Sequence, residues 1–200
     1  MKTALWLLGA LGLLGAFDTI YFHEIRGQLP AHLPGLSPEL TLHAGRSFIY
    51  VAVFGTLPWF AWRGAWAFAL GVLLVIEIGI TLADFIVEDQ VRKPFGGLLP
   101  GERTTHTIMA IVYGAMIANL IPVLLDWGRS ATDLHLKPVN VPLAYRLVLT
   151  ALAAGTFVSA VRDAYAVAGF PRRTARWPWL AHPGPAVAGG ERRESRRPSE

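Results

Sequence analysis

Three acidic residues share one stripe of a long apolar segment. Glu77, Asp84 and Glu88 are separated by seven and four residues, a spacing that places their side chains on one face of an α-helix. Charged groups are costly in the hydrocarbon of a membrane, so they usually face the interior of a helix bundle, where they pair or bind an ion or a substrate. The spacing therefore predicts a polar site inside a membrane protein, to which other helices contribute.

The composition is typical of a protein with several membrane-spanning helices. The chain has 200 residues, of which 53% are hydrophobic and 16% are charged, and its mean hydropathy is +0.42. Five apolar segments approach the ~20 residues that a helix needs to cross ~30 Å of hydrocarbon. They are residues 4–22, 42–62, 65–87, 104–125 and 141–161. These features predict an all-α integral membrane protein with about five transmembrane helices.

The loops predict the orientation and the organisation of the chain. Arg and Lys are enriched on the side expected to be cytoplasmic, which favours an N-terminus outside and a C-terminus in the cytoplasm. We expect residues 1–169 to form the transmembrane domain. Its first four helices would be a bundle with a polar interior near the cytoplasmic side, and the fifth a packing helix. Only Arg63 and Gly64 separate the second and third segments, which predicts a tight helical hairpin.

The basic charge of the chain is concentrated in its last thirty residues. Seven of the eighteen Lys and Arg residues follow Pro171, and the net charge is +4. We expect residues 170–200 to form a basic, disordered tail on the cytoplasmic side. Such a tail indicates contact with the anionic headgroups of membrane lipids rather than with nucleic acid.

The predicted topology brings polar residues of four helices to the same depth. Residues late in the first and third helices lie level with residues early in the second and fourth. This layer combines imidazoles with carboxylates, a ligand set suited to zinc, iron or manganese. The candidate metal ligands are His23, His43, His106, Asp84 and Glu88. The candidate catalytic residues are Asp18, Arg46 and Glu77.

Two of these residues have structural alternatives. Asp18 and His23 lie five residues apart, or about 140° around a regular helix, so both point inward only if the first helix ends or bends between them. Arg46 either holds an anionic headgroup or acts as the counter-ion of Asp84 or Glu88. Either role would place the guanidinium next to the predicted site.

Other polar residues are expected to have simpler roles. Tyr50 and Tyr113 fall on the inward faces of the second and fourth helices, so they are expected to line the same cavity. Four charged residues lie at predicted helix ends, where solvation, capping and loop pairing are common. They are Glu24, Asp89, Glu102 and Arg103. The three remaining histidines, His32, His135 and His182, fall in loops or the tail and are expected to be bystanders.

Several chemistries are excluded by missing residues. The chain has no cysteine, which excludes disulfides, iron–sulfur clusters and thiolate metal sites. The E-x-x-H pattern of di-iron carboxylate proteins and the H-E-x-x-H pattern of zinc proteases are also missing. The glycine-rich motifs of nucleotide sites do not occur.

Four segments together resemble a family of small bacterial multi-spanning membrane proteins. The segments are FDTIYFHE at 17–24, HAGRSFIY at 43–50, EIGITLADFIVED at 77–89 and ERTTHT at 102–107. In some members of that family the membrane region is attached to an NAD-binding, epimerase-like domain. The resemblance covers the first four helices and implies the bacterial inner membrane as location and an epimerase-like protein as a partner. It implies no activity and no site residue.

Three functions remain in competition. The first is a membrane-embedded, metal-dependent enzyme that acts on a lipid-like substrate from the cytoplasmic leaflet, with a carboxylate as general base. The second is a proton-coupled transporter or carrier, because Glu77 is expected at the middle of the membrane, with Asp84 and Glu88 below it. The third is a non-catalytic membrane subunit whose polar network fixes helix packing. Metal content, vesicle transport and partner recovery distinguish the three.

Overall fold

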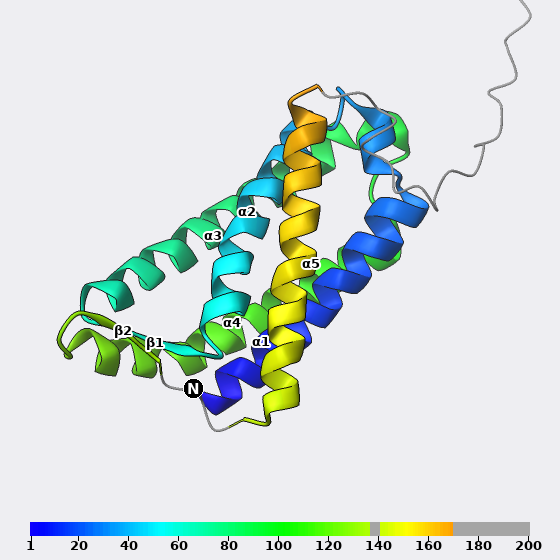
Figure 1. Cartoon of the computed structure of the whole chain (residues 1–200). Coiled ribbons are helices and arrows are strands. Elements are labelled where there is room, and N and C mark those ends of the chain that lie inside the picture. The colour runs from blue at the N-terminus through cyan, green and yellow to red at the C-terminus, as the bar shows by residue number, and fades with distance from the viewer. Residues whose placement is uncertain (137–140, 170–200) are drawn as a thin grey trace, which may run out of the picture.

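The computed structural model describes residues 1–136 and 141–169, and the predicted tail 170–200 lies outside the described residues (Figure 1). Most of the described chain is helical, as the sequence predicts, and it also contains two short strands and several turns. The long helices are α1 (Lys2–Phe17), α2 (Ser37–Thr56), α3 (Ala65–Val91), α4 (Pro100–Gly128) and α5 (Leu143–Val167). The short elements are η1 (Asp18–Arg26), η2 (Leu29–His32), η3 (Lys93–Phe95), β1 (Phe60–Arg63) and β2 (Asp133–Leu136).

Four helical segments of the described chain are long and apolar enough to cross a membrane. They are Lys2–Arg26, Ala65–Val91, Pro100–Gly128 and Leu143–Val167. The protein is therefore an all-α membrane protein, and its described residues contain four such helices rather than the predicted five. The difference is α2, whose first half contains Glu39, His43 and Arg46, so that too little of its 20-residue length is apolar.

The predicted hairpin between the second and third segments is wrong. Helix α2 ends at Thr56 rather than continuing to Trp62, because Pro58 lacks an N–H donor and its ring opposes further helix. The chain then forms strand β1, which pairs antiparallel with β2, placing Phe60 opposite Leu136. Gly64 follows the strand with a φ of +59°, a conformation that favours glycine, and α3 begins immediately after it.

The five long helices close into a ring. Around it, α1 packs on α4, α4 on α3, α3 on α2, α2 on α5, and α5 returns to α1. Figure 1 shows α5 lying along α2. The fifth helix is thus part of the bundle rather than an addition to the first four. Gly9 permits its approach to α1, because a side chain there would collide with Tyr145, whose hydroxyl donates to Leu5 O at 3.0 Å.

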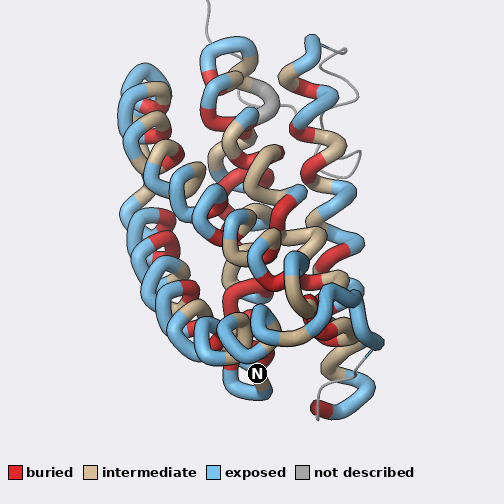
Figure 2. Tube along the Cα trace, turned by 90° about the vertical axis from the view of Figure 1, so that its left-hand side faces the viewer, coloured by how far each residue is buried: buried red, intermediate tan, exposed pale blue. Residues whose placement is uncertain are grey.

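Apolar and polar residues occupy opposite ends of the bundle. The apolar core lies where α1 begins; its largest members include Leu5, Leu8, Leu57, Leu70, Met116, Leu120 and Leu149. The opposite end, where η1 follows α1, holds the buried charged residues; we call it the η1 end. Figure 2 shows buried residues on the facing sides of the helices and exposed residues outside. The outward faces carry large apolar side chains such as Phe68, Val75 and Ile111, as expected for contact with lipid.

Candidate metal centre

The segment Asp18–Arg26 is a π-helix, and this places Asp18 and His23 side by side. A π-helix hydrogen-bonds residue i to residue i+5, so residues five apart stack above one another instead of diverging by about 140°. Asp18 Oδ2 lies 3.3 Å from His23 Nε2, and both side chains are buried. The sequence predicted that the first helix must end or bend here, and the change of helix type meets that requirement.

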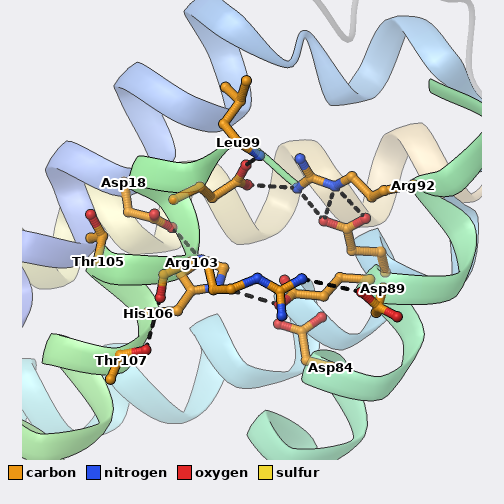
Figure 3. Close-up of polar contacts among 12 residues, drawn as sticks. Asp18, Asp84, Asp89, Arg92, Leu99, Arg103, Thr105, His106 and Thr107 are labelled. Carbon is orange, nitrogen blue, oxygen red and sulfur yellow. Dashed lines mark hydrogen bonds and ion pairs between the residues drawn. The ribbon is translucent and has the colours of Figure 1, made fainter. Parts of the chain in front are cut away.

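His106 of α4 completes a buried triad with these two residues. Its Nε2 atom lies 3.2 Å from Asp18 Oδ2, a contact drawn in Figure 3. One ligand atom from each of Asp18, His23 and His106 fits within a mutual separation of 4.8 Å. Because metal–ligand bonds of ~2.0–2.1 Å in a tetrahedral site put neighbouring ligand atoms ~3.3 Å apart, the two measured separations match those of a metal centre. Two imidazoles and a carboxylate are a common ligand set for catalytic zinc, which keeps a fourth position open.

Two further carboxylates flank the triad. Glu102 Oε1 lies 3.4 Å from His23 Nε2, and Glu88 Oε1 lies 3.4 Å from His106 Nδ1. Metal-binding histidines usually donate their second ring N–H to a carboxylate, which fixes the orientation of the ring. Glu88 has this position at His106, whereas Glu102 faces the same nitrogen of His23 as Asp18 does. Glu88, a predicted ligand, therefore lies behind His106 rather than beside the other ligand atoms.

The predicted ligands His43 and Asp84 form a neighbouring ion pair. His43 Nε2 lies 3.1 Å from Asp84 Oδ2, and Arg46 Nη1 approaches the same oxygen at 3.2 Å. His43 and Arg46 lie about one turn apart on α2, so both reach one carboxylate of α3. The ring of His43 stacks on that of His23, with centroids 4.7 Å apart. Arg46 is thus the counter-ion of Asp84, which was one of its two predicted roles.

A second set of buried charges closes the η1 end. Arg92 Nε donates to Glu39 Oε2 at 2.9 Å, and Arg92 Nη2 lies 3.0 Å from Glu102 Oε1 (Figure 3). Burial lowers the pKa of the Arg92 guanidinium, but the hydrogen bonds to Glu39 and the charges of Glu39, Glu102 and Glu88 together outweigh it and raise that pKa. Because Glu102 also contacts His23, this clamp connects α2, α3 and α4 to the triad.

Sequence reasoning missed this clamp. Glu39 and Glu102 are 0% exposed, although both lie in the first turn of a helix, where solvation is the usual expectation. The segment containing η2 covers them, since Leu29 and Leu36 pack with Leu40 over this end of the bundle. Burial by an irregular segment of this kind produces no periodic pattern of apolar residues in the sequence, so it could not be predicted.

The other residues expected at helix ends divide into two groups. Arg103 pairs with Asp89 at 3.2 Å on the exposed surface, as expected. Glu24 is instead buried and pairs with Arg162, which also contacts Asp163. These contacts join η1 to the end of α5, where the sequence predicted only a packing helix.

Glu77 lies deeper in the bundle, apart from the triad. Its Oε1 atom accepts hydrogen bonds of 2.8 Å from the hydroxyls of Tyr50 and Thr81. Tyr50 and Tyr113 are neighbours, with ring centroids 6.2 Å apart, as their helix positions predicted. Glu77 precedes Asp84 by seven residues, or ~10 Å along the helix, so it belongs to a separate polar position.

The charge balance at the η1 end depends on the three buried histidines, His23, His43 and His106. Five buried carboxylates surround the histidines, namely Asp18, Glu39, Asp84, Glu88 and Glu102. Two arginines, Arg46 and Arg92, pair with them. With neutral imidazoles this group carries an excess of three negative charges, a costly arrangement in a low-dielectric interior. Within the described residues, His23 Nε2, the ring nitrogen that faces Asp18, also lacks a well-aligned hydrogen bond. A divalent cation would relieve both features.

A lateral groove reaches Asp18 from the lipid-facing side. It has a volume of about 760 Å³ and runs between α1 and α5, with mainly apolar walls. Asp18 lines it, as do Arg46 and Tyr50 of α2. A smaller polar cavity of about 40 Å³ adjoins it and is lined by His23 and His43. Both spaces share Arg46. Asp18, and with it the candidate metal centre, is therefore within reach of a molecule that enters the groove.

No family model, curated protein or solved structure matches this chain, so the family resemblance remains a prediction.

Proposed function

We propose that this protein is a membrane-embedded, metal-dependent enzyme that acts on a lipid-like substrate from the cytoplasmic leaflet of the bacterial inner membrane. The observation that carries the proposal is the triad itself. Asp18 Oδ2 lies 3.2 and 3.3 Å from two imidazole nitrogens, inside a group of buried residues that holds five carboxylates and two arginines. The groove between α1 and α5 supports a lipid-like substrate, because its mainly apolar walls lead to Asp18.

The residues have distinct roles in this proposal. Asp18, His23 and His106 hold zinc, iron or manganese, and Glu88 orients the ring of His106. The metal supplies a Lewis acid, or a nucleophile from bound water at neutral pH. Glu102 is the nearest further carboxylate, and its ion pair with Arg92 favours the ionised form that a general base requires.

Elemental analysis of the detergent-purified protein tests this proposal. We expect close to one zinc, iron or manganese ion per chain in the wild type and near-complete loss in His106→Ala. His135→Ala is the matched control, because His135 is an exposed histidine of β2 that pairs with Asp133. Wild-type protein purified without chelators that contains no stoichiometric metal would refute the proposal.

A proton-coupled carrier is the second candidate, and Glu77 favours it. This buried carboxylate accepts from two hydroxyls through Oε1, while its Oε2 atom lacks a hydrogen-bond partner among the described residues. A buried acid of this kind in a membrane helix is suited to carry a proton. Glu77→Gln would then abolish transport in vesicles and leave the metal content unchanged.

The third candidate is a non-catalytic subunit, favoured by the clamp of Arg92 with Glu39 and Glu102. In that case protonated imidazoles would balance the carboxylates, and substitutions would change only stability or partner recovery. An NAD-binding, epimerase-like protein is the partner that the sequence resemblance proposes. Its co-purification with the wild type, and its loss with Asp84→Asn, would support this candidate.

A further inference from the structure

The groove between α1 and α5 has a polar end and an apolar end. Toward the η1 end it is lined by Asp18, Thr19 and Arg46, and toward the other end by Leu11, Phe54 and Leu152. A molecule that fills it must therefore be amphipathic. We infer that this groove binds a single-chain lipid with a compact, carboxylate-sized head, of which a long-chain fatty acid is the simplest example. This lipid would be the substrate of the proposed enzyme. Its role as a substrate rests on the proposed function, whereas its binding in the groove does not.

The dimensions of the groove suit one acyl chain. Its lining on α5 extends from Val148 to Ser159, eleven positions further along the helix, or ~16 Å at 1.5 Å per residue. That length is about half of the ~30 Å hydrocarbon thickness of a bilayer, and so about the depth of one leaflet. Its volume of about 760 Å³ lies within the ~300–1,000 Å³ range of sites for small molecules.

The adjoining cavity limits the size of the head. Its volume of about 40 Å³ accommodates roughly three water molecules, at ~10–15 Å³ for each. A carboxylate, hydroxyl or aldehyde fits this space, whereas the phosphodiester headgroup of a membrane phospholipid does not. His23 lines the cavity, so a head in this position lies beside the metal centre.

Arg46 provides the charge that favours a carboxylate. It lines both the groove and the small cavity and contacts Asp84 through Nη1. A guanidinium has five N–H donors in a planar fork, so one carboxylate contact does not exhaust it. Arg46 can therefore pair with Asp84 on one side and with an acidic lipid head on the other.

The groove can be filled without disturbing the helix packing. Gly155 of α5 lines it, and a Cβ atom at this position would meet no other atom within 4 Å. Gly155→Phe would project a ring into open groove while improving the helix propensity of α5. Gly114 of α4 is an exposed glycine with equally open space around it, but it does not line the groove. Gly114→Phe is therefore the matched control.

Photo-crosslinking in lipid nanodiscs tests the inference. A diazirine analogue of palmitic acid should label α1 and α5 in the wild type and in Gly114→Phe. In Gly155→Phe the labelling should fall by about tenfold or more, because the ring occupies the space of the chain. Equal labelling of Gly155→Phe, or equal labelling of the groove by a diazirine phospholipid or by the methyl ester of the palmitate probe, would overturn the inference.

The experiment also separates this inference from the proposed enzyme. If His106→Ala loses its metal but retains labelling, both stand. If the wild type contains no metal yet Gly155→Phe still loses labelling, the lipid site stands and the metalloenzyme does not. If the wild type contains metal and Gly155→Phe is labelled as strongly as the wild type, the proposed enzyme stands and the inferred single-chain lipid substrate is wrong.

Discussion

Asp18 and His23 are five residues apart, yet Oδ2 of the first lies 3.3 Å from Nε2 of the second. The π-helical segment between them makes this contact possible, and His106 adds a second imidazole nitrogen on the same oxygen at 3.2 Å. π-Helical segments occur frequently at functional sites because they redirect side chains within an otherwise continuous helix. Here the redirected pair forms the centre of the candidate site.

Replacing Asp18 should remove the metal without unfolding the bundle. Asp18→Asn keeps the size of the side chain but loses the anionic ligand, so zinc affinity should fall by more than the ~10–100-fold typical of residues behind the ligands. Competition with a zinc-binding dye measures the affinity. Glu77→Gln is the control, since Glu77 lies outside the triad. Equal affinities in Asp18→Asn and the wild type would show that Asp18 is not a ligand.

Glu88 should tune metal binding rather than provide it. Its Oε1 atom faces Nδ1 of His106, the ring nitrogen away from Asp18. We expect Glu88→Gln to weaken zinc binding by ~10–100-fold and to retain one ion per chain at saturation. Asp89→Asn, a change of the adjacent exposed acid, should have no effect. Loss of stoichiometric binding in Glu88→Gln would instead make Glu88 a ligand, as the sequence predicted.

Removing Arg92 should destabilise the protein strongly. Arg92→Met would leave Glu39 and Glu102 buried without their cation, at a cost of ~3–5 kcal/mol. Thermal unfolding in detergent measures the change. Arg103→Met removes an exposed partner of Asp89 and should cost less than ~1 kcal/mol. Similar unfolding temperatures for the two variants would contradict the buried clamp.

The close contact of α1 with α5 should depend on Gly9. A larger side chain there would displace Tyr145, so Gly9→Leu should cost ~1–3 kcal/mol through overpacking, even though leucine is the better helix former. Gly71→Leu on α3 is the control, because no atom lies within 4 Å of its added Cβ. The same unfolding assay applies, and an unchanged stability of Gly9→Leu would show that the two helices can separate freely there.

Acidification should release the metal. Protons compete with the ion for the nitrogens of His23 and His106, so affinity must fall as the pH falls, by at most ~100-fold per pH unit for two imidazoles. Zinc titrations between pH ~8 and ~6 measure this slope. His43→Phe should keep the slope, because the ring nitrogen of His43 faces Asp84, and its contact with the triad is ring stacking on His23, which phenylalanine preserves. A pH-independent affinity would exclude imidazole ligands.

The sequence predicted the depth of the site within the bundle better than the contacts between its side chains. Alternating helix directions correctly place Asp18, His23 and His106 at one depth, and the counter-ion role of Arg46 follows from nearby acids of α3. The sequence did not identify the ligands correctly, because a regular helix would point Asp18 and His23 in different directions. Only the π-helix brings their side chains together. The spacing on α3 favoured Asp84 and Glu88 as metal ligands. In the structure Asp84 faces His43 and Arg46 of α2, and Glu88 faces Nδ1 of His106, so neither acid lies beside the ligand atoms of the triad.

Burial at the η1 end was the other feature that sequence could not provide. Glu39 and Glu102 follow the pattern of first-turn acids, and such residues are usually solvated. Their burial depends on how the chain between α1 and α2 folds back over the bundle, through η2 and Leu36. The end of α2 was mispredicted for a local reason, since the apolar residues after Pro58 suit a strand as well as a helix.

X-ray absorption spectroscopy of the zinc-loaded protein tests the triad most directly. We expect two imidazole ligands with Zn–N distances of ~2.0–2.1 Å, together with oxygen ligands. The number of imidazoles should stay at two in His43→Phe, whereas His106→Ala should retain no stoichiometric zinc at this site. A spectrum without imidazole, or one in which loss of His43 changes the first shell and loss of His106 does not, would contradict a metal centre formed by Asp18, His23 and His106.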